Sequence, residues 1–265
     1  MREAPTQRLY VEEYGEGDSL LLIEGLGQSM WAWREQIPVF AEHYRTIAFD
    51  ARGTGRSRVP EEPYGIDELA RDAADILAGR RAHVVGLSMG GYTALTLALA
   101  EPELVRSLVL AATGAGGSDR VPRPKGVRDA YAAAVGLPFD EYGRTTMPMT
   151  FSPGWTERNP ERFEEVLAAR REHPTPDVTL DAHLQACYGF YNRGCEVERI
   201  EAPTLVLHGD ADVVVPVENG RMLASRLPNA RYLELPGLGH NLPLEDPATF
   251  NRLVLRFLRE SSAFA

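Results

Sequence analysis

A serine flanked by two glycines, in the sequence GLSMG at residues 86–90, constrains the fold of this chain most strongly. Residues 81–87 form a short apolar run typical of a strand, and residues 92–100 form a helix-forming run. A serine on so tight a strand-to-helix turn must adopt strained backbone angles, and side chains two residues away on either side would collide. Glycine at both positions removes that collision. The pattern therefore predicts a sharp strand–turn–helix unit with Ser88 as a candidate nucleophile.

Two later segments place further reactive side chains at the ends of strands. Residues 202–208 are predicted to form a buried parallel strand, and Asp210 and Asp212 follow its end. Residues 230–235 are predicted to form another strand, and the glycine-containing loop after it carries His240. Open α/β sheets place their sites at the carboxyl ends of strands. The sequence therefore predicts a serine, an acid and a histidine in this chain order, with either aspartate as the acid.

The remaining apolar runs alternate between strand and helix. Further strands are predicted at residues 9–14, 19–24, 44–50 and 105–112, and helices at 30–42 (broken near Pro38), 66–78 and 246–260. This alternation predicts an α/β fold with a mostly parallel, doubly wound sheet covered on both faces.

The alternation stops between residues 113 and 199, a segment that we call the helical insert. It is rich in glycine and proline at first and then contains helix-forming segments near residues 127–134, 160–171 and 178–191. About 85 residues between two strands far exceed an ordinary connection. We therefore expect a core of residues 1–112 and 200–265, interrupted by the helical insert.

Composition excludes several classes of function. The chain has 265 residues, 44% hydrophobic and 25% charged, as in ordinary globular proteins, and its net charge of −10 would repel a nucleic-acid backbone. A small-molecule substrate fits better. The first 17 residues lack the apolar stretch of a secretory signal, and no apolar run is long enough for a membrane span. We therefore expect a cytoplasmic protein that is not bound to membranes, with a homodimer as an open alternative for its assembly.

Four segments resemble the α/β-hydrolase family: GLSMGG at 86–91, DARGTGRS at 50–57, LVLHGDADVVVP at 205–216 and PGLGHNLPLEDP at 236–247. The chain looks most similar to small capped esterases, enol-lactone hydrolases and cofactor-free haloperoxidase-like members. The resemblance implies an α/β-hydrolase fold in which the helical insert is a cap. It covers essentially the whole chain.

The resemblance also implies roles for individual residues. Ser88 would attack a carbonyl, His240 would take the serine proton and return it to the leaving group, and Asp212 would orient the imidazole. Asp212 matches the acid position of the family better than Asp210 does.

The same resemblance implies an oxyanion hole made of the backbone N–H groups of Leu26 and Met89. Relatives usually carry histidine at the position of Glu24, two residues before Leu26. An ionised carboxylate there would oppose the oxyanion, so we expect the Glu24 side chain to point away and to order the loop of residues 25–27 by accepting backbone hydrogen bonds.

The leading function is therefore hydrolysis of a small or medium carboxylic ester or lactone through an acyl-enzyme. Carbon–carbon bond hydrolysis or perhydrolysis by the same triad remains an alternative, as does a non-catalytic ligand-binding relative. No cofactor or metal is expected. His83 is predicted to lie at the surface or at a sheet edge, His208 to be structural, and His183 to pack within the helical insert or contact substrate.

Overall fold

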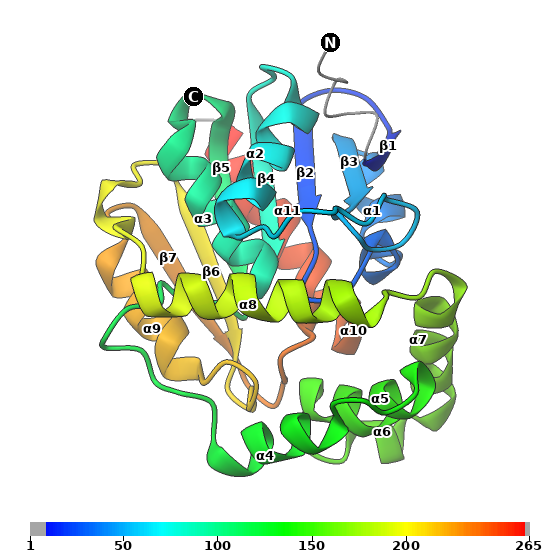
Figure 1. Cartoon of the computed structure of the whole chain (residues 1–265). Coiled ribbons are helices and arrows are strands. Elements are labelled where there is room, and N and C mark those ends of the chain that lie inside the picture. Colours follow the sequence, from blue (N-terminus) through cyan, green and yellow to red (C-terminus); the bar gives the residue numbers. More distant parts are fainter. Residues whose placement is uncertain (1–8, 263–265) are drawn as a thin grey trace.

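The computed structural model describes residues 9–262 and is built on a central seven-stranded sheet (Figure 1). The strands are β1 (Tyr10–Tyr14), β2 (Ser19–Ile23), β3 (Arg45–Asp50), β4 (Ala82–Leu87), β5 (Val105–Ala111), β6 (Thr204–Gly209) and β7 (Ala230–Leu235). Their order in the sheet is β1-β3-β2-β4-β5-β6-β7. Only β1 is antiparallel to its neighbour β3, and the other pairs are parallel. The mostly parallel α/β sheet expected from the sequence is confirmed.

Helices cover both faces of this sheet because its central strands are apolar on both sides. Every residue of β2, β4 and β6 is buried. The core helices and short 3₁₀ turns are η2 (Met30–Trp33), α1 (Ile37–Ala41), α2 (Ile66–Leu77), α3 (Met89–Ala100), η3 (Pro102–Leu104), α9 (Val217–Arg226), α10 (Leu242–Glu245) and α11 (Pro247–Ser262). One apolar cluster joins α2 and α3 to the sheet, and a second joins α1 and α11 to it.

The helical insert leaves the sheet after β5 and returns at β6. It contains α4 (Lys125–Ala134), α5 (Phe139–Thr146), η4 (Met147–Thr150), α6 (Trp155–Arg158), α7 (Pro160–Glu172), α8 (Asp177–Arg193) and η5 (Val197–Arg199). Residues 113–199 are described throughout and contain no strand. Figure 1 shows α8 crossing in front of the sheet, with α4 to α7 below it.

The aromatic residues of the helical insert have two different roles. Phe151 stacks on Trp155 at 4.2 Å between ring centroids, within a small apolar cluster formed mainly by the insert, including Phe163, and completed by Leu244 of α10. Phe190 of α8 instead stacks on Tyr92 of α3 at 4.6 Å, and the Tyr92 and Tyr191 hydroxyls are hydrogen-bonded. The insert is thus packed against the helix that follows Ser88.

The break predicted near Pro38 is confirmed: η2 and α1 are two short helices separated at residues 34–36, and Pro38 lies in the first turn of α1, where its missing N–H costs no hydrogen bond. Other details differ from the sequence predictions. The helices α5 and α9 and the one-turn helices α6 and α10 were not predicted. His83 lies fully buried rather than at the surface or an edge, with Nδ1 2.7 Å from the Ser107 hydroxyl, because β4 is a central strand between β2 and β5.

Within residues 9–262, none of the helices has the length and apolar character needed to cross a lipid bilayer. The N-terminal segment in which the sequence predicts no secretory signal includes residues 1–8, which lie outside the described residues.

Candidate active site

Ser88 lies on a strained turn between β4 and α3. Its backbone angles are φ 55° and ψ −114°, a conformation that residues with a side chain rarely adopt. The turn is held by the hydrogen bond from Ser88 N–H to the Ala111 carbonyl, 2.9 Å, at the end of the neighbouring strand β5. A Cβ atom at Gly90 would lie 2.1 Å from the Ile23 carbonyl oxygen, so only glycine fits there. The two flanking glycines thus allow the turn, as the sequence predicted.

Asp212 and His240 are brought together by the loops after β6 and β7. His240 Nδ1 lies 2.8 Å from Asp212 Oδ2, and Asp212 Oδ1 accepts hydrogen bonds from the N–H groups of Val214 and Val215. Burial alone would raise the pKa of the Asp212 carboxyl, but the charge of His240 and hydrogen bonds from His208 and His240 outweigh it and hold that pKa below its usual value. Asp212 is therefore ionised and suited to orient the imidazole.

Asp210, the competing acid, has a different partner. Its Oδ1 accepts a hydrogen bond from the Gly237 N–H at 2.7 Å, at an exposed position in the turn after β7. Asp210 therefore stabilises the turn that leads to His240.

His208 adds a contact that the sequence analysis did not assign to the site. At the end of β6, its Nε2 lies 2.8 Å from the Val215 carbonyl oxygen and 3.2 Å from Asp212 Oδ2. Gly220 of α9 packs on the other side of the ring, where a Cβ would lie 2.3 Å from Nδ1. In the sequence, the four-residue spacing between His208 and Asp212 at the end of a strand could have indicated this contact.

The loop that carries His240 is fixed by the helical insert and by α10. Gly239 N–H donates to Glu245, and a Cβ on Gly239 would lie 2.4 Å from the Phe151 backbone. Asn241 N–H donates to the Thr150 carbonyl at 2.7 Å. The residues before and after His240 are thus both held in place, which fixes the position of the imidazole.

The loop at residues 25–28 presents a free backbone donor. Gly25 N–H donates to the Gln28 side chain, and Gly27 N–H donates to His183 Nδ1. Within residues 9–262, the N–H groups of Leu26 and Met89 have no acceptor. Burial lowers the pKa of His183 to about 4, so its imidazole is neutral and accepts the hydrogen bond from Gly27. His183 therefore packs against this loop from α8.

Glu24 is buried, with an exposed fraction of 1%, but it does not order the loop of residues 25–27 as we expected. Its Oε1 accepts a hydrogen bond from the Ala51 N–H at 2.7 Å, which joins the ends of β2 and β3, and its Oε2 has no partner among residues 9–262. Burial raises the pKa of the Glu24 carboxyl well above its usual value, nearby Asp50 raises it further, and backbone hydrogen bonds offset only part of the increase. The raised pKa favours the neutral form of this carboxyl, which carries no charge to oppose an oxyanion.

The structure does not join Ser88 to His240 by a hydrogen bond: among residues 9–262, the Ser88 hydroxyl has no hydrogen-bond partner, and Ser88 itself is half-buried. Catalytic hydrogen bonds are often long in the absence of substrate and shorten in the complex.

Two other kinds of site are less well supported. Burial raises the pKa of the Cys187 thiol to about 12, which makes it a poor nucleophile. Within residues 9–262, no cluster of three or more His, Cys, Asp or Glu side chains could hold a metal ion.

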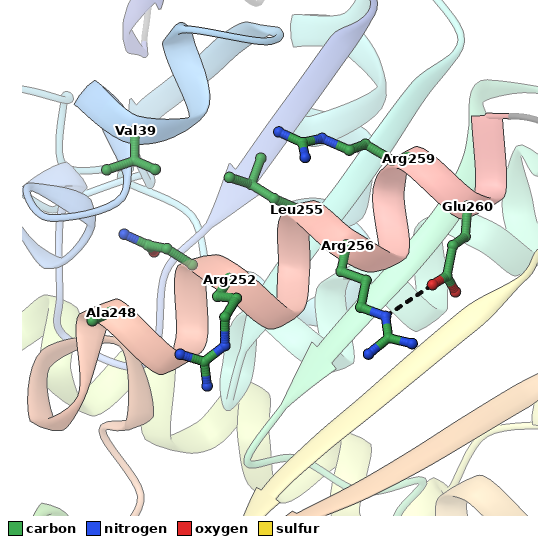
Figure 2. A pocket seen from close by; sticks show the side chains of 8 residues that line it. Val39, Ala248, Arg252, Leu255, Arg256, Arg259 and Glu260 are labelled. Atoms are coloured by element: carbon green, nitrogen blue, oxygen red, sulfur yellow. Dashed lines mark hydrogen bonds and ion pairs between the residues drawn. The ribbon is translucent and has the colours of Figure 1, made fainter.

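A groove of about 620 Å³ lies elsewhere, along α11, and contains none of the predicted site residues. Figure 2 shows its lining, with Val39 and Leu255 beside the exposed Arg252, Arg256 and Arg259, and Arg256 paired with Glu260.

Comparison with known proteins agrees with the geometry. Residues 18–247 match the family described as the alpha/beta hydrolase fold. The chain belongs to the α/β-hydrolase family. This α/β-hydrolase is 33% identical over 255 residues to the putative carbamate hydrolase RutD of Azorhizobium caulinodans, covering 95% of each chain. It is 30% identical to 3-oxoadipate enol-lactonase 2 of Acinetobacter baylyi, covering 91% of this chain and 89% of that one.

Among solved structures, the α/β-hydrolase is similar to the enol-lactonase from Burkholderia xenovorans LB400, with a TM-score of 0.83 and 27% identity over 95% of this chain and 96% of that one.

Proposed function

We propose that this α/β-hydrolase cleaves a small or medium carboxylic ester or lactone through an acyl-enzyme, with Ser88, His240 and Asp212 as a catalytic triad. The observation that carries the proposal is the Asp212–His240 hydrogen bond in the same fold that places Ser88 on a strained turn between β4 and α3. The relatives named as an enol-lactonase and a putative carbamate hydrolase support acyl chemistry of this kind.

In the proposed mechanism, His240 Nε2 takes the proton of the Ser88 hydroxyl while the serine oxygen attacks the substrate carbonyl. Asp212, held ionised by three hydrogen bonds and by the nearby His208 ring, fixes the tautomer with the proton on Nδ1 and stabilises the imidazolium. The free N–H groups of Leu26 and Met89 would receive the developing oxyanion. His240 then protonates the leaving alkoxide, and water releases the acyl group in the reverse sequence.

We also propose that the helical insert acts as a cap over this site. Its residues contact both loops that the mechanism requires, through His183 at Gly27 and through Thr150 at Asn241. In this role it would shape the pocket for the acyl group.

A fluorophosphonate labelling experiment tests the proposal. The reagent should add one covalent group at Ser88, and Ser88→Ala should lower kcat for ester hydrolysis by roughly 10⁴- to 10⁶-fold. Stoichiometric labelling of another residue would contradict the assignment of the nucleophile. A panel of nitrophenyl esters, lactones and aryl carbamates then ranks the substrate classes, and turnover of none of them would favour a non-catalytic relative.

A further inference from the structure

Arg123 lies in the segment that connects β5 to α4, directly beside the loop of the proposed catalytic acid. Its Nε donates to the Val214 carbonyl at 2.9 Å, and the Val214 N–H in turn donates to Asp212 Oδ1. Its guanidinium carbon lies 4.7 Å from the centre of the Tyr131 ring of α4. Arg123 thus connects the helical insert to the loop that carries Asp212.

The charge of Arg123 reaches side chains of several helices around this point. Burial raises the pKa values of five groups, and the positive charge of Arg123 opposes that rise in each. These groups are Tyr92 of α3, Tyr131 of α4, Tyr142 of α5, and Cys187 and Tyr191 of α8. The negative charge of Asp212 also acts on Tyr131 and Tyr191. The guanidinium therefore lies where the core and the helical insert meet, close to the proposed triad.

This half-buried guanidinium is not neutralised by the protein. Within residues 9–262, no carboxylate lies within 4.0 Å of Arg123, and its two Nη atoms make no hydrogen bond. Arg120, three residues earlier on the same segment, instead donates from both Nη atoms, to the Gly117 carbonyl and to the Asn192 side chain. A planar guanidinium with both Nη groups free matches the two oxygens of a carboxylate.

We propose that Arg123 binds a carboxylate of the substrate, so that the enzyme prefers monoanionic esters or lactones, which carry a free carboxylate beside the scissile acyl group. This inference rests on the proposed function. A single guanidinium balances one negative charge, which favours a carboxylate over a doubly charged phosphate. Arg123 takes no part in proton transfer, because a guanidinium stays protonated throughout.

Matched ester pairs test this inference. Monomethyl esters of linear dicarboxylic acids with four to eight carbons carry one free carboxylate, and the dimethyl esters of the same acids are neutral. Hydrolysis of both series is followed by chromatography of the products. In the wild-type enzyme, kcat/KM should be higher for the monoester than for the diester at one or more chain lengths.

Arg123→Gln should then lower the monoester-to-diester ratio of kcat/KM by roughly 10- to 100-fold, mainly through KM, as expected for one charge-assisted pair. Arg123→Lys, which keeps the charge, should restore part of the ratio. Arg120→Gln is the matched control and should leave the ratio as it is.

Two results would overturn the inference: a wild-type preference for the neutral diesters, or an Arg123→Gln variant that loses activity equally on both series. The second would show that Arg123 only holds the Asp212 loop. Failure of the proposed function is distinguishable, because neither series would then be hydrolysed and fluorophosphonate would not label Ser88. Circular dichroism of each variant shows that a change in the ratio does not come from misfolding.

Discussion

Asp212 accepts three hydrogen bonds and has His208 Nε2 at 3.2 Å, whereas Asp210 accepts from the Gly237 N–H, and the two carboxylates lie only two residues apart. Asp212→Asn should therefore lower kcat by about 10²-fold or more, reaching about 10⁴-fold if the tautomer of His240 is lost, as in the strictest serine protease case. Asp210→Asn keeps an oxygen for Gly237 and should cost far less. Steady-state kinetics of both variants on one ester compares them, and a larger loss at position 210 would overturn the assignment of the acid.

Glu24 allows a prediction about stability and pH. Its pKa is raised in the folded state, so above the ordinary glutamate pKa of about 4.5 the folded protein binds a proton that the unfolded chain has lost. The contribution of Glu24 to stability is therefore present at low pH and is lost as pH rises through the folded pKa, with a slope of up to about 1.4 kcal/mol per pH unit. Glu24→Gln should remove this slope, so its Tm relative to wild type should increase from pH 5 to pH 8.

Thermal unfolding at several pH values measures this difference for Glu24→Gln. Glu234→Gln is a useful control, since Arg221 holds the pKa of Glu234 below its usual value of 4.5. The contribution of Glu234 is lost only as pH falls below that value, so the Tm difference of this variant should stay constant from pH 5 to pH 8. A Tm difference for Glu24→Gln that does not change with pH would contradict a neutral buried carboxyl.

At the residue scale, the sequence predicted those features of the site that depend on contacts between residues close in the chain. The glycine spacing around Ser88 fixes the turn, because the collisions it avoids are between residues close in the chain. The partner of Glu24 was not predictable, because Ala51 follows β3 and meets Glu24 only through the parallel pairing of β2 with β3. The contact of His208 with Asp212 depends likewise on how the loop after β6 folds back.

At the scale of elements, the loop of residues 25–28 is tied to the loop of His240 by a pair of amides. The Gln28 side chain accepts from Gly25 N–H at 2.9 Å and donates from Nε2 to Asn241 Oδ1 at 3.2 Å. Asn241 Nδ2 donates in turn to the Thr150 hydroxyl at 2.8 Å. One chain of side chains thus links the loop of the proposed oxyanion donor, the loop of the proposed catalytic histidine and the helical insert.

Gln28→Ala should displace the Leu26 N–H from the position of the oxyanion and lower kcat by roughly 10- to 100-fold with a smaller change in KM, since a complete hole donor contributes roughly 10²- to 10³-fold. Gln28→Glu keeps the acceptor for Gly25 and removes the donor to Asn241, which separates the two bonds. The exposed Gln185→Ala is the control. An effect of Gln28→Ala on KM alone would argue against a role in positioning the loop.

The strands were predictable as elements because buried parallel strands are continuous apolar runs, and six of the seven predicted segments differ from the structure by at most two residues at an end while residues 230–235 match β7. The helices α5 and α9 were not predicted, because their sequences, FDEYGRTT and VENGRMLASR, contain glycine and few apolar residues. Their positions depend on tertiary packing, as in the contact of Gly220 with His208.

At the scale of the whole molecule, the helical insert is joined to the core by two buried threonine side chains and by an exposed ion pair. The Thr179 hydroxyl of α8 donates to the Gly53 carbonyl at 3.1 Å, and Thr175 donates to the Gly27 carbonyl. Arg193 pairs with Asp67 of α2. These contacts indicate that core and insert unfold as one unit.

Thr179→Val should therefore shift a single unfolding transition of the whole protein, because it leaves the Gly53 carbonyl without a partner at a cost of about 1–3 kcal/mol. Each kcal/mol corresponds to a fall in Tm of about 2–4 °C for a chain of this size. Thr145→Val, at an exposed position of α5, should have little effect. Calorimetry makes the comparison, and a separate early transition in Thr179→Val would show that the insert unfolds independently.

The strained turn at Ser88 predicts an opposition between stability and activity. A positive φ of 55° costs about 1–3 kcal/mol in a residue with a side chain, and part of this would be recovered with glycine, whose greater freedom in the unfolded chain reduces the gain by about 0.4–1 kcal/mol. Ser88→Gly should thus be more stable than Ser88→Ala by about 1 kcal/mol, although neither variant retains the proposed nucleophile. Calorimetry of the two variants decides, and equal Tm values would contradict the prediction.

Heat resistance and chemistry thus make opposite demands on the same position. A laboratory evolution experiment that selected only for stability at high temperature would favour glycine at residue 88 and would yield more stable variants that lack the proposed nucleophile.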